Sequence, residues 1–187
     1  APEDAPVLRK ALDACDQHLR PYIPFMKDEP RTLEQTAQWL RGHRAAFDLD
    51  QMLRYAIFDR DEVNLLGENM LISRVGPGAL EIGFWTHKDA IGRGIATETS
   101  AIMTRVAFEL EKVDRVEIMC APENAASAAI PAKLEFNHEA TVRRRAHNSD
   151  GELCDPMIWS LFASDFPSSP AAVFNYTAYD CMGRKIG

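Results

Sequence analysis

The chain has 187 residues, of which 46% are hydrophobic and 26% charged, enough for one globular domain with a sizeable core. Its formal net charge of −7 argues against a general nucleic-acid-binding role, because the phosphate backbone is bound by clustered lysine and arginine. No run of about 18 apolar residues is present, so we expect no membrane span, and the sequence suggests no signal peptide.

Two helices are predicted at the start of the chain. A helix over residues 4–19 has one apolar face, made of Val7, Leu8, Ala11, Leu12 and Cys15. An apolar loop over residues 22–26 follows. The second helix begins at Thr32, because Thr32 and Gln35 have the spacing of a capping box, in which each side chain satisfies a backbone amide of the first turn.

Strands follow these helices. Residues 55–58 and 65–72 read as a hairpin joined by a polar turn, and Gly76-Pro77-Gly78 indicates another turn. Residues 80–85 alternate, so that Glu81, Gly83 and Trp85 share the face opposite Leu80, Ile82 and Phe84.

The second half begins with a regular helix over residues 95–110, whose apolar residues recur at helical spacing. A strand over 115–120 and a short helix capped by Asn124 come next, and Pro131 is expected to kink or end that helix. The last strands are predicted over 140–146 and 156–161, joined by a turn over 147–151. The segment after Phe166 is an unassigned tail, so we divide the chain into a domain over 1–166 and a tail over 167–187.

Charge and thiol patterns allow two smaller interpretations. Arg143-Arg144-Arg145 is interpreted as a solvated strand edge, with contact to an acidic substrate or a phosphate group as the alternative. The cysteines, Cys15, Cys120, Cys154 and Cys181, form no C-x-x-C pair and no metal-binding spacing. This usage is typical of reduced thiols, so we expect a cytoplasmic protein without a bound metal.

The segment with the clearest chemistry is Gly92-Arg93-Gly94-Ile95-Ala96-Thr97, which opens the long helix. Small residues let a ligand approach the backbone, and the first turn of a helix presents unpaired amides at the positive end of its dipole. Together they form an anion site suited to a pyrophosphate. A tight turn without a ligand is the alternative. A dinucleotide fingerprint is disfavoured, because it needs a third small residue where Thr97 stands.

Three motifs in order make the context specific. They are the strand over 80–85 with the glycine segment over 92–98, then Pro122-Glu123-Asn124-Ala125-Ala126-Ser127, then Lys133-Leu134-Glu135-Phe136. Over residues 5–166 the chain closely resembles the GNAT acetyltransferase superfamily, and within it the RimJ/RimL-like group. Two positions depart from the family pattern: Ile91 stands where glutamine or arginine is usual, and Glu135 where glycine is usual, which questions the local turn.

The resemblance implies an α/β (α+β) fold with a mixed, curved, mostly antiparallel sheet and helices on both faces. The family's first strand normally precedes the position of Ala1, so we expect either a sheet that lacks one edge strand or a sequence that is trimmed at its start. Acetyl-CoA is the implied donor, wedged where the strand over 81–85 diverges from the strand over 116–120. The implied cofactor-binding residues are Phe84, Trp85, Thr86, Arg93, Gly94, Ile95, Ala96, Thr97, Asn124 and Ser127.

Direct transfer needs a neutral amine, so a group that removes its proton matters. Glu81 is our candidate, acting through a water; a carboxylate paired to a neighbouring strand is the alternative. Strand amides could stabilise the oxyanion that forms on attack. Ser127 matches a serine proposed as the family's acid, and it could hydrogen-bond the leaving sulfur, or simply lie in a helix's first turn. His87 as a base and Cys120 as a nucleophile are less favoured than a loop histidine and a core thiol.

The acceptor pocket is assigned to the aromatic residues Tyr22, Phe25 and Trp85, with plain core packing as the alternative. An N-acetyltransferase acting on a protein N-terminal α-amine is the first hypothesis. A small-molecule amine acetyltransferase, for a polyamine, amino acid or antibiotic, is the second, and a non-catalytic acetyl-CoA-binding module is the third. A homodimer is expected from the resemblance alone.

Overall fold

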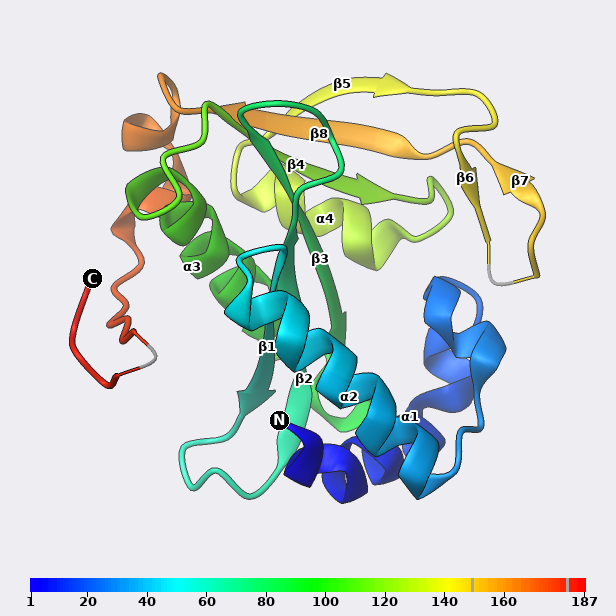
Figure 1. The fold of residues 1–187 in the computed structure, drawn as a ribbon. Helices are drawn as coiled ribbons and strands as arrows, with labels where there is room; N and C mark the ends of the chain where they lie inside the picture. The colour runs from blue at the N-terminus through cyan, green and yellow to red at the C-terminus, as the bar shows by residue number, and fades with distance from the viewer. Residues whose placement is uncertain (149, 181) are drawn as a thin grey trace.

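A computed structural model describes residues 1–148, 150–180 and 182–187. Its main sheet has six strands in the order β1-β2-β3-β4-β8-β5, and only the β3–β4 pair is parallel (Figure 1). The strands are β1 (Met52–Phe58), β2 (Leu65–Ile72), β3 (Ala79–Thr86), β4 (Arg115–Cys120), β5 (Asn137–Thr141) and β8 (Met157–Phe162). The prediction of a mixed, mostly antiparallel sheet is confirmed.

The helices are α1 (Ala5–Leu19), α2 (Leu33–Asp48), α3 (Ile95–Glu109) and α4 (Ala125–Lys133). They bury two hydrophobic clusters, one on each face of the sheet. Ile82 of β3 packs with α3 and α4 in the larger cluster, whereas Trp85 of the same strand packs with α1 and α2 in the other. Because alternate residues of a strand point to opposite faces, this split follows from the predicted pattern of β3.

Local signals in the sequence are borne out at several helix ends. The Thr32 side chain accepts from the Gln35 amide, and Gln35 returns a bond to the Thr32 amide, so the capping box at α2 is present. Asn124 caps α4 in the same manner through the Ser127 amide. Pro131 does not end α4, which continues to Lys133.

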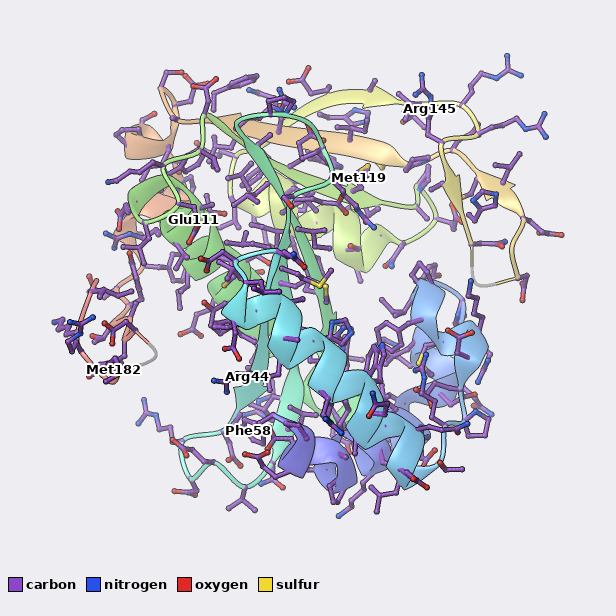
Figure 2. The ribbon with its side chains drawn as sticks, in the orientation of Figure 1. Arg44, Phe58, Glu111, Met119, Arg145 and Met182 are labelled. Atoms are coloured by element: carbon purple, nitrogen blue, oxygen red, sulfur yellow. The ribbon has the colours of Figure 1, made fainter. Side chains whose placement is uncertain are left out.

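The prediction of one strand over 140–146 is wrong. β5 begins at Asn137 and ends at Thr141, and a turn separates it from a small hairpin of β6 (Ala146–His147) and β7 (Leu153–Cys154). The predicted turn over 147–151 includes Ser149, which lies outside the described residues. Arg143, Arg144 and Arg145 are exposed in the turn before β6 and not on a strand edge. Figure 2 shows the position of Arg145.

The segment after Phe166 packs on the domain. Two short 3-10 helices, Phe166–Ser168 and Pro170–Val173, lead to Phe174, whose carbonyl accepts from Arg105 of α3 at 2.6 Å. The Tyr176 hydroxyl donates to Glu109 of α3 at 3.1 Å. Apolar side chains of this segment also join the cluster under α3, so residues 166–176 extend the fold beyond the predicted domain end.

None of the helices in the described ranges is long and apolar enough to cross a membrane. Of the four cysteines, Cys15, Cys120 and Cys154 are free thiols, and Cys181 lies outside the described residues.

Candidate active site

The two central parallel strands separate at one end of the sheet. Their register runs from Ala79 opposite Arg115 to Ile82 opposite Ile118, after which no further pair joins them in the part of the chain that the structure describes. β3 nevertheless continues to Thr86, still paired with β2 on its other side. The β3 backbone over residues 83–86 therefore has groups on its β4 side that an extended, amide-bearing molecule could pair with.

The glycine segment lies immediately after this opening. Gly92 and Gly94 have φ angles of 75° and 80°, the left-handed region, and Gly94 is the N-cap of α3. A Cβ built on either glycine would meet nothing within 4 Å, so the surface above them is open. The amides of Ile95, Ala96 and Thr97 begin a helix of 15 residues and have no carbonyl of a preceding turn to bond. This geometry fits an anion such as a pyrophosphate.

Cys120, the last residue of β4, is buried. Burial raises the pKa of the Cys120 thiol, and contacts with Trp159 of β8 and Ser127 of α4 partly oppose that rise. Cys120 therefore stays protonated at neutral pH, in keeping with a core thiol. The Asn124 carbonyl oxygen accepts from the Ser127 amide at 3.1 Å, which leaves the Ser127 hydroxyl free of that capping bond.

Glu81 is buried on the opposite face of the sheet from α3, with its side chain only 4% exposed. Arg74, from the loop before β3, donates to both carboxylate oxygens at 2.7 and 2.6 Å. These bonds raise the pKa of Arg74 above its ordinary value. The ion pair favours the alternative of a paired carboxylate, although each oxygen retains a second lone-pair direction.

Of the aromatic residues assigned to the acceptor pocket, Phe25 and Trp85 join one hydrophobic cluster, to which Tyr22 does not belong. Phe25 packs on Trp39 at a ring-centroid distance of 5.3 Å, and the Arg54 guanidinium lies 4.5 Å from the Trp39 ring centroid. Trp85 is only 2% exposed and is packed between the sheet and α1. Tyr22 is 40% exposed. The Trp85 side chain thus belongs to the core, while its backbone remains part of the open strand.

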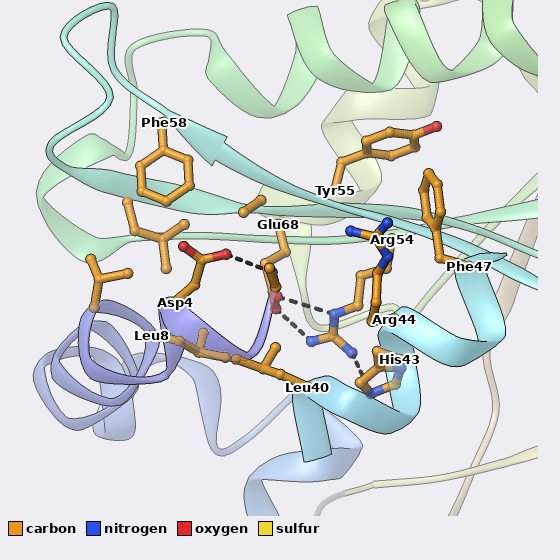
Figure 3. A pocket seen from close by; sticks show the side chains of 14 residues that line it. Asp4, Leu8, Leu40, His43, Arg44, Phe47, Arg54, Tyr55, Phe58 and Glu68 are labelled. Carbon is orange, nitrogen blue, oxygen red and sulfur yellow. Dashed lines mark hydrogen bonds and ion pairs between the residues drawn. The ribbon is translucent and has the colours of Figure 1, made fainter. Parts of the chain in front are cut away.

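A buried ionic network that the sequence analysis did not identify joins Arg54, Glu68 and His43 (Figure 3). Arg54 of β1 donates to Glu68 of β2 through Nε at 3.1 Å, and the Trp85 indole donates to Glu68 at 2.6 Å. The network borders a cavity of about 300 Å³, which lies between Asp4 near the N-terminus, α2 and the strands β1 and β2. The signal in the sequence for this network was Glu68, a charged residue within a strand whose ends are apolar.

His43 belongs to the same network. Its Nε2 lies 3.2 Å from Arg54 Nη1, and burial together with the neighbouring Arg54 charge lowers the pKa of His43 from 6.5 to about 4. The imidazole is therefore neutral at pH 7. His87, by contrast, caps its own turn by accepting from the Asp89 amide at 3.2 Å, as expected of a loop histidine.

Comparison with known proteins gives a family match over most of the chain. Residues 1–137 match the acetyltransferase (GNAT) domain family. YdaF of Bacillus subtilis (strain 168), a ribosomal N-acetyltransferase by name, is 27% identical over 149 residues, which cover 76% of this chain and 77% of YdaF.

Solved structures share the fold. Mycobacterium smegmatis RimJ in complex with CoA-disulfide is 25% identical, with a TM-score of 0.78, over 92% of this chain and 83% of RimJ. The microcin C7 self-immunity acetyltransferase MccE, in complex with acetyl-CoA and AMP, is 17% identical with a TM-score of 0.77, over 87% of this chain and 88% of MccE. The MccE likeness concerns the fold alone.

Proposed function

Because the chain belongs to the GNAT acetyltransferase family and is an N-acetyltransferase, we propose that it takes the acetyl group from acetyl-CoA and transfers it directly to a protein N-terminal α-amine. The observation that carries the proposal is the opening between β3 and β4, directly followed by the left-handed glycines at the start of α3. Acetyl-CoA supplies an acetyl thioester, an acyl group already activated towards an amine.

The chain's backbone provides most of the proposed donor site. The amides of residues 93–97 hold the pyrophosphate, and the backbone of Phe84, Trp85 and Thr86 pairs with the pantetheine arm. Support comes from the open surface above Gly94 and from the unpaired β4 side of β3. Backbone donors of this kind do not depend on the residue at position 91, so the departure at Ile91 leaves the site intact. The Asn124 and Ser127 side chains border the sulfur.

Proton movement is assigned to two side chains. Glu81 accepts the amine proton through a water at the lone pairs that Arg74 leaves free. Ser127 donates a hydrogen bond to the departing sulfur, because a serine hydroxyl is too weak an acid to give up its proton outright. Ser127 lies in the first turn of α4, the helix that follows the end of β4.

The acceptor is proposed from the names of the relatives. YdaF is by name a ribosomal N-acetyltransferase, which favours a peptide N-terminus approaching past Tyr22 and Phe25. A small-molecule amine is the second candidate acceptor. The exposed ring of Tyr22 is available to either acceptor.

The test is release of the CoA thiol from acetyl-CoA in the presence of free-N-terminus peptides, polyamines or aminoglycosides. Release that requires a peptide supports the proposal, release with a small amine supports the second candidate, and no release with any acceptor contradicts both. Gly94→Trp should abolish CoA binding measured by calorimetry. Gly76→Trp is the matched control, because Gly76 also has a positive φ and open space but lies in the turn before β3.

A further inference from the structure

Asn69 occupies an unusual position for a polar side chain. It lies in the middle of β2, paired with Tyr55 of β1 on one side and Phe84 of β3 on the other. It is only 1% exposed, and the next residue on the same face, Leu71, is part of the apolar core. A buried amide costs free energy unless its groups are bonded, so this position calls for a physical reason.

The Asn69 amide reaches the beginning of α3. Its Nδ2 donates to the Thr99 hydroxyl at 3.2 Å, and that hydroxyl donates to the Ile95 carbonyl at 2.9 Å. A continuous chain of hydrogen bonds therefore joins the centre of the sheet to the first residue of the helix. Asn69 Oδ1 has no hydrogen-bond partner among the described residues. Only one of the four hydrogen bonds that such an amide can make is formed among the described residues, so stability alone does not account for it.

The hydrogen bonds from Asn69 through Thr99 to Ile95 connect the two halves of the proposed donor site. Phe84, opposite Asn69 in the register, belongs to the strand assigned to the pantetheine arm. Ile95 belongs to the helix turn whose amides are assigned to the pyrophosphate. One ligand must contact both halves at once, so a fixed spacing between them lowers the free energy of ordering the site on binding.

We infer that Asn69, acting through Thr99, is a positioning residue that holds the first turn of α3 at a fixed spacing from β3 and so prepares the site for the pyrophosphate of acetyl-CoA. This inference rests on the proposed function. It assigns no contact between Asn69 and the ligand. We call the hydrogen-bonded link from Asn69 through Thr99 to Ile95 the tether. Losing the tether should weaken binding of a ligand that contacts both halves of the site. It should leave the affinity for a ligand that contacts β3 alone almost unchanged.

The experiment compares CoA with pantetheine, which lacks the pyrophosphate and the adenosine. Asn69→Leu and Thr99→Val remove the two ends of the tether with little change of volume. Thr99→Ser keeps the hydroxyl and should rescue binding. Thr104→Val is the matched control, because Thr104 is another threonine of α3, and its buried hydroxyl donates to the Ser100 carbonyl at 2.8 Å, beyond the first turn.

Calorimetry with CoA should show a Kd raised about five- to tenfold in Asn69→Leu and Thr99→Val, the effect expected from one hydrogen bond. Ligand-detected NMR with pantetheine should show a change of less than about twofold, and Thr99→Ser and Thr104→Val should resemble the parent protein with both ligands. Circular dichroism checks that each variant is folded. If Asn69→Leu does not fold, the comparison of Thr99→Val with the parent protein tests the inference.

Equal weakening for CoA and pantetheine, or equal effects of Thr99→Val and Thr104→Val, would overturn the inference, since either would indicate a general structural role. Unchanged CoA binding in Thr99→Val would overturn it as well. If the parent protein itself does not bind CoA, the proposed function fails, and the inference fails with it. The parent titration therefore separates the two failures.

Discussion

Replacing Glu68 by leucine should destabilise the protein strongly, because the Arg54 guanidinium would remain buried without its carboxylate. The Arg54 and Glu68 side chains are only 7% and 4% exposed, and Glu68 also accepts from the Trp85 indole. Removing one partner of a buried ion pair costs about 3–5 kcal/mol, since the charge left behind has lost its hydration. For a chain of this length that corresponds to a fall in Tm of roughly 6–20 °C.

Urea denaturation followed by circular dichroism measures this change, provided that the m-value stays constant. The double variant Arg54→Leu/Glu68→Leu should recover much of the stability, because no unpaired charge remains. Asp48→Asn is the matched control: it breaks the exposed pair with Arg44 and should cost less than about 1 kcal/mol. A Glu68→Leu cost below about 1 kcal/mol, or strictly additive effects of the two leucines, would refute the reasoning.

Three further predictions concern a histidine, a turn and the candidate base. The pKa of His43 is about 4 in the folded protein and 6.5 ordinarily, so the unfolded chain binds a proton at higher pH than the folded protein does. The free energy of unfolding should therefore fall as the pH drops from about 6.5 to 4. Urea midpoints measured across that pH range should vary less in His43→Gln than in the parent protein. Glu135→Gly should stabilise by about 0.5–1 kcal/mol in the same assay, because Glu135 has a φ of 58° where glycine is favoured; unchanged stability would show that the turn is not strained. If Glu81 is the base, Glu81→Gln should lower kcat by about 10²–10⁴-fold and leave the affinity for CoA within about a few-fold of the parent value. Arg74→Gln should retain turnover. Equal losses of kcat in the two variants would indicate that Glu81 serves only as the partner of Arg74.

Sequence patterns predicted the elements where the signal repeats within one segment. α3 begins at Ile95 as its apolar spacing indicated, and β2 has the predicted bounds of residues 65–72. The polar run over 140–146 had no comparable repeat, and there the predicted strand was wrong. Within residues 137–147, the part that pairs with β8 is β5, which ends at Thr141. The chain then turns away into the β6–β7 hairpin.

The candidate site divides in the same way. The segment proposed to bind the pyrophosphate is local, since its glycines, its cap and its amides lie within six consecutive residues, and Gly92 and Gly94 have the left-handed conformation that the proposal needs. The side-chain partners were not predictable. The partner of Glu81 comes from the loop before its strand, and Trp85 reaches Glu68 across the sheet.

By itself, then, the sequence determined the order of the elements, the two faces of β3 and the glycine turn that opens α3, because each depends on the conformation of neighbouring residues. Only the tertiary structure decided that Trp85 is a core side chain, that Glu81 is paired with Arg74, and that Asn69 is joined to α3 through Thr99. The physical reason is that hydrogen bonds and burial between distant segments depend on strand order, register and helix packing, and a residue's type does not specify which segment will lie against it.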